Sequence, residues 1–258
     1  MWQQLKEIYA YREMLRNLVA KELRARYKGS VLGFLWTFFN PLLMLIVYSV
    51  VFSFVMRAQI ENYAMFLFVA LLPWNYLSAS VLQGAASLVQ NGALIKKIYF
   101  PREVLPLSIV LTNLVNYLLS LLILIPALLA FKIRLTAALL ALPAVLLVQT
   151  MLVASLAFLV AVANVYFRDL EHIVGILMTV WFFLTPVLYP VDVIPPEARP
   201  FFNLNPATPL MEAYRAIFFY GHWPDWVALG KLAVALAILL VASLWVFDKF
   251  KRNIAEEI

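Results

Sequence analysis

Residues 137–164 read AALLALPAVLLVQTMLVASLAFLVAVAN, without a single Asp, Glu, Lys or Arg. A helix needs about 20 mostly apolar residues to cross the hydrocarbon core of a bilayer, so this stretch predicts a membrane span. Similar charge-free stretches recur along the chain. They predict six spans, at residues 32–56, 63–84, 106–130, 137–164, 172–190 and 228–247.

The composition agrees with a lipid environment. The 258 residues are 65% hydrophobic and 13% charged, which leaves too little polar surface for an ordinary soluble domain. We therefore predict an all-α integral membrane protein that forms a single domain over residues 1–258. It consists of an N-terminal segment (1–28), a six-span core (32–247) and a tail (248–258).

The basic residues predict the orientation. Cytoplasmic loops of membrane proteins carry an excess of Lys and Arg, and an even number of spans puts both termini on one side. With both termini in the cytoplasm, only six of the 20 Lys and Arg residues fall outside. These six are Arg57, Lys132, Arg134, Arg199, Arg215 and Lys231. The net charge of +6 thus reflects topology, and no nucleic-acid partner is expected.

The N-terminal segment repeats apolar residues every three or four positions, which predicts an amphipathic helix on the inner leaflet. Its basic end lies just before the first span and either holds an anionic headgroup or pyrophosphate, or serves topology alone. This end comprises Arg24, Arg26, Tyr27 and Lys28.

The inner loop between spans two and three contains Leu94, Ile95, Ile98 and Tyr99 on a short predicted helix that ends at Pro101. A linker without a partner would not need these apolar residues. They predict a docking surface.

The outer segment between spans five and six, residues 191–227, is rich in proline yet strongly apolar. Irregular backbone at membrane depth is tolerated only where protein or a water-filled cavity covers it. We predict short re-entrant or interfacial helices here.

Several chemistries are excluded or disfavoured. Cysteine is absent, so disulfides, thiolate metal sites and cysteine nucleophiles are excluded, and two histidines leave little for metal binding. The chain has no Walker A sequence, so uphill transport would draw its energy from another polypeptide. No predicted span carries Asp, Glu, Lys or Arg in its interior, which disfavours a proton- or sodium-driven carrier. We expect no metal or cofactor on this chain.

Polar groups inside the predicted spans favour hydrogen bonds between helices over a ligand role. Asn113 and Asn116 share one helix face, and Asn40-Pro41 predicts a kink that shapes a pore or improves packing. The full set is Asn40, Gln83, Asn113, Asn116, Gln149, Asn164, Thr179 and Thr185.

The residues leave two classes of protein open, an enzyme and a channel or scaffold. A membrane-embedded lipid- or glycan-modifying enzyme would use the outer polar residues, of which His222 and Asp225 could share a helical face. The outer polar residues are Asp192, Glu197, Arg199, Glu212, Arg215, His222 and Asp225. Isolated loop charges are usually solvated, so we predict no catalytic residue. An ATP-independent channel or scaffold would leave the apolar inner loop unexplained.

Six short motifs, in this order, carry a resemblance to a known family. They are Arg26-Tyr-Lys-Gly-Ser-Val-Leu-Gly-Phe-Leu-Trp36, Asn40-Pro41, Leu94-Ile-Lys-Lys-Ile-Tyr-Phe-Pro-Arg-Glu-Val-Leu-Pro106, Phe167-Arg-Asp-Leu-Glu171, Phe183-Leu-Thr-Pro-Val-Leu-Tyr189, and Asn205-Pro206 with Glu212-Ala-Tyr-Arg215. With this topology the chain resembles the membrane subunit of ATP-binding-cassette type-2 exporters of lipid-linked polysaccharides such as O-antigen and teichoic acid. Related permeases export drugs, haem or lipids.

The resemblance implies a homodimer in the bacterial cytoplasmic (inner) membrane, with two copies of a separate ATPase that binds ATP and Mg. The inner-loop helix would be the coupling helix that enters the ATPase, beside the N-terminal interface helix. Its residues are Asn91, Leu94, Ile95, Lys96, Lys97, Ile98 and Tyr99.

The resemblance also implies a path for the substrate. The Leu32-Gly33 turn, with Arg24, Arg26, Tyr27 and Lys28, would meet the pyrophosphate of an undecaprenyl-linked glycan at the inner gate. The first and fifth spans would line the pore. The implied pore-lining residues are Trp36, Phe39, Asn40, Trp181 and Phe182.

Overall fold

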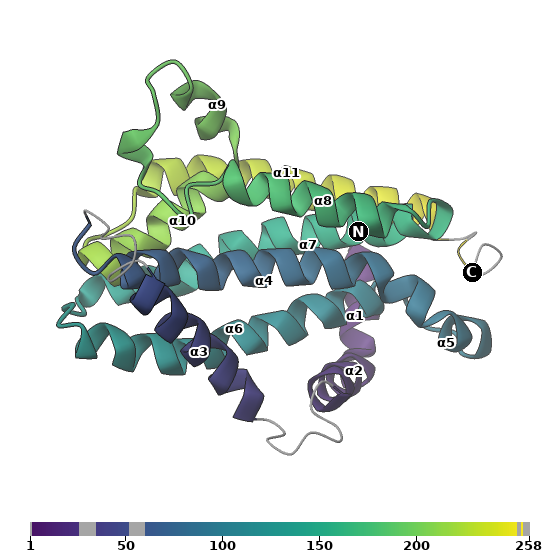
Figure 1. Cartoon of the computed structure of the whole chain (residues 1–258). Coiled ribbons are helices and arrows are strands. Elements are labelled where there is room, and N and C mark those ends of the chain that lie inside the picture. The colour runs from purple at the N-terminus through teal and green to yellow at the C-terminus, as the bar shows by residue number, and fades with distance from the viewer. Residues whose placement is uncertain (1, 26–34, 52–59, 252–253, 255–258) are drawn as a thin grey trace.

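The structure is a computed structural model that describes residues 2–25, 35–51, 60–251 and 254. Every regular element in these ranges is a helix, which confirms the all-helical prediction. The longer helices run side by side in one bundle (Figure 1). They are α3 (Trp36–Val50), α4 (Tyr63–Gln90), α6 (Val104–Ala130), α7 (Leu142–Tyr166, preceded by the short helix Ala137–Ala141), α8 (Leu170–Phe183) and α11 (Trp226–Phe250).

Four of these helices are long and apolar enough to cross a membrane within the described residues: α4, α6, α7 with its preceding turn, and α11. The helices at the first and fifth predicted spans are shorter. α3 has 15 described residues, and α8 ends at Phe183 rather than at residue 190. The 14 residues of α8 reach about 21 Å, less than the roughly 30 Å of the hydrocarbon core.

Helix α4 lies at the centre of the bundle and packs against α3, α6, α7, α8 and α10. It approaches α7 closely, since a Cβ built on Gly84 would stand 3.1 Å from Ala157 Cβ. Small residues at such a crossing let two helix backbones approach closely. The amide of Gln149 on α7 also donates to the carbonyl of Pro73 on α4, at 2.7 Å.

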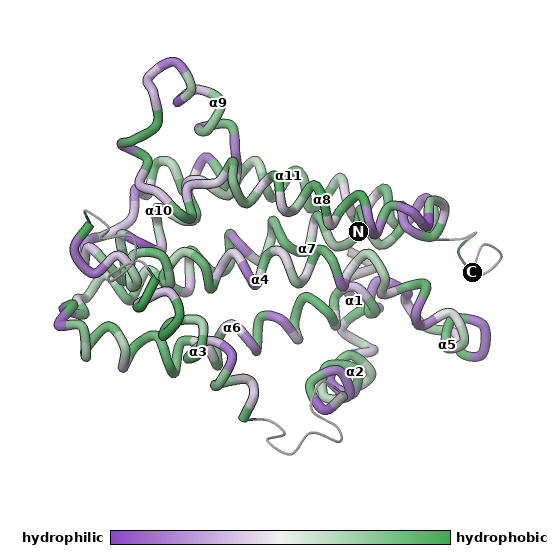
Figure 2. Tube along the Cα trace, in the orientation of Figure 1, coloured by the Kyte–Doolittle hydropathy of each residue, from purple (hydrophilic) through white to green (hydrophobic). Residues whose placement is uncertain are grey.

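Hydrophobic residues cover the long helices, and hydrophilic residues gather at helix ends and connections (Figure 2). The N-terminal segment forms two helices, α1 (Trp2–Ala10) and α2 (Arg12–Ala25), rather than one, with a turn at Tyr11. Figure 1 looks along the axis of α2, which lies across the long helices and packs on α6. Leu18 is buried there.

The outer segment contains short helices, as predicted: η4 (Val191–Val193), α9 (Arg199–Leu204), α10 (Ala207–Arg215) and the π-helix η5 (Ala216–Tyr220). Leu210, Ile217 and Phe218 are buried, as their apolar character predicts. The same expectation is wrong for α9, which stands away from the bundle in Figure 1 and leaves Phe201 and Leu204 exposed.

Candidate functional site

The exposed surface of α4 is made of amides. Asn75, Gln83 and Gln90 are the exposed residues of this helix, and all its other residues are buried or half-buried. Spacings of eight and seven residues put the three side chains on one side of the helix, which we call the amide face. Bilayer-facing positions are apolar, as Val234 and Ile238 on α11 illustrate. The amide face therefore suits water or a polar partner rather than lipid.

α3 and α8 both pack on α4. Asn40 on α3 and Thr179 on α8 are exposed polar residues of these two helices. Of the predicted pore-lining residues on α3, Phe39 is also exposed and Trp36 is half-buried. Sequence reasoning missed Asn75 and Gln90, although the regular spacing of amides in an apolar stretch was a usable signal.

A cavity of about 450 Å³ lies between α3, α4 and α6, and we call it the amide cavity. Asn113 of this cavity donates to Gln83 Oε1 at 3.1 Å, which confirms the predicted hydrogen bond between helices. For Asn116 that prediction is wrong: both polar atoms of its side chain are buried without a hydrogen-bond partner. The lining residues are Trp36, Asn40, Pro41, Met44, Phe68, Leu71, Leu72, Asn75, Tyr76, Ala79, Asn113, Asn116, Tyr117 and Ser120.

The predicted pore-lining rings on α8 are engaged in packing. Trp181 and Phe182 are half-buried, and their ring centroids lie 5.8 and 5.5 Å from that of Trp74 on α4. Trp181 Nε1 also donates to Asn205 Oδ1 at 2.7 Å. These contacts join α8 to α4 and to the outer segment, and a pore-lining role for the two rings stays a prediction.

Arg215 at the end of α10 is fully buried and satisfies the carbonyl groups beyond the end of α8. Its guanidinium donates to the carbonyls of Pro186 at 2.6 Å and Val187 at 2.7 Å, and to Glu212 Oε1 at 3.1 Å. It also lies over the ring of Phe66, 3.7 Å from the centroid. These hydrogen bonds hold the loop that follows α8 against the end of α10.

Asn205 acts at the same place. Its amide donates to Thr185 Oγ1 at 2.9 Å and to the carbonyl of Leu184 at 3.1 Å. We call Arg215 and Asn205 the outer clamp, because together they hold the end of α8 on the outer segment. The sequence marked both residues as motif positions but did not indicate this role.

The histidine and aspartate of the enzyme alternative, His222 and Asp225, do not form the predicted pair. The carboxylate of Asp225 accepts from the backbone of Val227 at 2.9 Å and Ala228 at 3.0 Å, so it caps α11. Residues 221–225 are not helical, so the predicted shared helical face of His222 and Asp225 is wrong. Among the described residues, no group of three or more His, Cys, Asp or Glu could hold a metal ion.

The predicted coupling helix is α5 (Gly92–Lys97), which Asn91 alone separates from α4. The predicted docking face needs correction, because Ile95 is buried in the core and Leu94 is half-buried against it. Ile98 and Tyr99 follow the helix in extended backbone and are 55% and 92% exposed. They are the apolar residues available to a partner.

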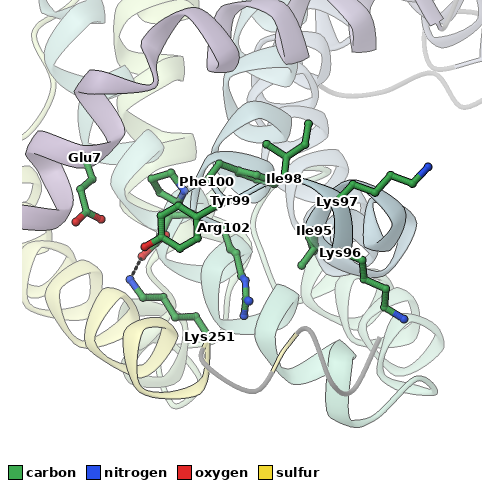
Figure 3. Close-up of a pocket in the computed structure, with 11 residues that line it drawn as sticks. Glu7, Ile95, Lys96, Lys97, Ile98, Tyr99, Phe100, Arg102 and Lys251 are labelled. Atoms are coloured by element: carbon green, nitrogen blue, oxygen red, sulfur yellow. Dashed lines mark hydrogen bonds and ion pairs between the residues drawn. The ribbon is translucent and has the colours of Figure 1, made fainter.

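A second cavity, of about 470 Å³, lies beside α5 (Figure 3). In its wall Glu103, which is buried, pairs with Lys251 beyond the end of α11, with 2.9 Å between Glu103 Oε1 and Lys251 Nζ. We call this pair the inner brace. Burial alone would lower the pKa of Lys251, but its hydrogen bonds to Asp248 and Glu103 outweigh burial and raise it. Lys96 and Lys97 point outward from α5.

The implied headgroup gate lies almost wholly outside the described residues. Arg24, near the end of α2, is exposed. The other implied gate residues, for which no position is described, are Arg26, Tyr27, Lys28, Leu32 and Gly33.

The chain was compared with known proteins. Residues 13–219 match the model of the ABC-2 type transporter family. A protein of Myxococcus xanthus named O-antigen export system permease protein RfbA is 43% identical over 98% of both chains. A Klebsiella pneumoniae protein of the same name is 32% identical over 95% of this chain and 94% of its own. The chain therefore belongs to the ABC-2 type transporter family.

Proposed function

We propose that the chain is the permease subunit of an ATP-driven exporter that moves a lipid-linked O-antigen polysaccharide across the cytoplasmic membrane. The names of the relatives from Myxococcus and Klebsiella support this substrate. The observation that carries the proposal is the amide face. Neutral amides that both donate and accept hydrogen bonds suit a hydroxyl-rich chain passing along an otherwise apolar helix.

The functional unit in this proposal is a homodimer. The amide face is open in the single chain, and burying polar groups against lipid is costly. Two copies that turn their amide faces toward each other would enclose a polar path, which we call the conduit. α3 and α8, which flank α4, would complete its wall, with Trp36 and Phe39 as stacking surfaces for sugars.

Energy would come from two copies of a separate ATPase that holds ATP and Mg. Exposed Ile98 and Tyr99 beside the basic Lys96 and Lys97 form a mixed surface suited to a groove on that partner. Movement of α5 would reach the amide face directly, because Asn91 joins α5 to α4 and its amide donates to the carbonyl of Ser87 at 2.8 Å.

The proposed topology has both termini in the cytoplasm and six spans, with α3 and α8 as the two short ones. α1 and α2 would lie at the inner leaflet as the interface helix. The basic end of that helix, with Arg24 and the Leu32-Gly33 turn, would meet the pyrophosphate of an undecaprenyl carrier.

The test replaces the amides of the conduit. We expect Asn75→Leu with Gln90→Leu to abolish surface O-antigen in cells that lack the native permease gene, while protein amount and ATPase co-purification stay normal. The matched control is Val234→Leu with Ile238→Leu on the exposed face of α11, which should export normally. Normal export by the amide-face variant would overturn the proposal.

A further inference from the structure

Among the described asparagines that line the amide cavity, Asn116 alone has a side-chain amide that is buried and makes no hydrogen bond. Asn116 lies near the middle of α6, and neither its Oδ1 nor its Nδ2 has a partner although both atoms are buried. The neighbouring Asn113 is satisfied by Gln83 and by the carbonyl of Ile109. An unpaired amide away from water costs free energy, so Asn116 requires a partner that the described residues do not supply.

The lining of the cavity defines the chemistry of that partner. It contains no charged residue, so an ion is disfavoured. Four amides and two phenols are unsuited to an acyl chain, and aromatic rings such as Trp36 offer apolar faces beside them. The volume of about 450 Å³ falls in the range of small-molecule sites. These properties fit a neutral ring that carries several hydroxyl groups.

The cavity also adjoins the proposed conduit. Asn75 belongs both to its lining and to the amide face, and Asn40 lines it from α3. Both residues are exposed, so a group that moves along the amide face can enter from there.

We propose that the amide cavity is a binding site for one sugar residue of the transported chain, held by hydrogen bonds between its hydroxyls and the side-chain amide of Asn116. The inference rests on the proposed function and adds to it a defined side pocket on α6. Occupation of the cavity by water alone is the competing state, and the experiment distinguishes it.

The chain contains no cysteine, so a single introduced cysteine reports on one position. Ala79→Cys lines the cavity, and Thr179→Cys on α8 reports on the conduit outside it. Both would be labelled with a water-soluble maleimide in membranes that hold the complete transporter. Membranes from cells that synthesise the lipid-linked O-antigen are compared with membranes from cells in which its synthesis is blocked.

We expect the glycan to slow labelling at both positions several-fold. Adding Asn116→Leu should remove protection at Ala79→Cys and leave protection at Thr179→Cys. Asn116→Gln should restore protection, and Asn164→Leu, which removes a buried amide on α7 outside the cavity, should leave it intact.

Three outcomes would overturn the inference while the proposed function stands, each with Thr179→Cys protected. The first is labelling of Ala79→Cys that the glycan never slows, which means water alone. The second is protection that survives Asn116→Leu. The third is a complete lack of labelling at Ala79→Cys, which means a sealed cavity. Failure of the glycan to protect either position would count against the proposed function itself.

Discussion

Single residues at the outer end hold together elements that are too short to be stable alone. Arg215 is fully buried, and its donors go to the backbone carbonyls of Pro186 and Val187 in the loop beyond α8. Asp225 similarly caps the first turn of α11. Two residues that read as solvated outer charges in the sequence are therefore structural.

Arg215→Lys should lower the free energy of unfolding by about 2–3 kcal/mol, because a lysine cannot reach two carbonyls and Glu212 in a planar fork. Thermal unfolding of the detergent-purified protein measures this. Arg199→Lys is the matched control, since the side chain of Arg199 is exposed and should tolerate the exchange. An equal loss of stability in both variants would contradict the role of Arg215 in the outer clamp.

Asp225→Ala should cost about 1 kcal/mol through loss of the helix cap, whereas Asp225→Ser should retain most of the stability. The same thermal measurement checks both variants. If Asp225 were catalytic instead, serine would fail as fully as alanine in an export assay.

At the scale of elements, the sequence predicted the presence of α5 but not which of its residues face a partner. Hydrophobic periodicity marks residues that avoid water, and it cannot distinguish burial within the chain from burial under another chain. Ile95 packs into this bundle, while Ile98 and Tyr99 do not. Periodicity likewise predicted one N-terminal helix, because the turn at Tyr11 has no proline or glycine to mark it.

Ile98→Asp with Tyr99→Asp should reduce co-purified ATPase about tenfold while leaving the permease folded, because both side chains are exposed. Ile95→Asp should instead lower the amount of folded permease, since it buries a charge in the core. Fluorescence-detected size-exclusion chromatography distinguishes the two effects. Undiminished ATPase binding by the exposed pair would remove α5 from the proposed coupling path.

The crossing of α4 and α7 supplies another prediction. Gly84→Val should destabilise the protein by about 1–3 kcal/mol, because its Cβ would stand 3.1 Å from Ala157 Cβ. Gly230→Val on α11 is the control, since nothing lies within 4 Å of a Cβ there. Thermal unfolding should separate the two variants clearly.

At the scale of the whole molecule, the all-helical architecture and the outer short helices followed from the sequence because span length and proline content are local signals. The C-terminal end of α8 did not follow from the sequence, because Arg215 and Asn205, which hold the residues after it, come from a later segment of the chain. The amide cavity was equally hidden: Asn113 and Asn116 look alike in sequence, and only packing shows that one of them is paired.

The inner brace joins Glu103, at the start of α6, to Lys251, at the end of α11. Lys251→Met should destabilise the protein by about 3 kcal/mol, because it leaves Glu103 buried without its cation, whereas Lys249→Met should not. The raised pKa of Lys251 means that the lysine stabilises the fold fully below its ordinary value of 10.5 and loses this effect only as pH rises beyond it. Thermal stability should therefore show no step from Lys251 between about pH 6 and 9.

The central position of α4 has a consequence for biogenesis. Of the four long helices α4 is the least apolar and the most buried, with 78% of its apolar window inside the bundle against 17% for α11. It emerges from the ribosome before α6 and α7, the helices that cover it. The helix must therefore wait in or beside the insertion machinery until those later helices arrive, and a chain interrupted after α4 would present quality-control proteases with an uncovered helix.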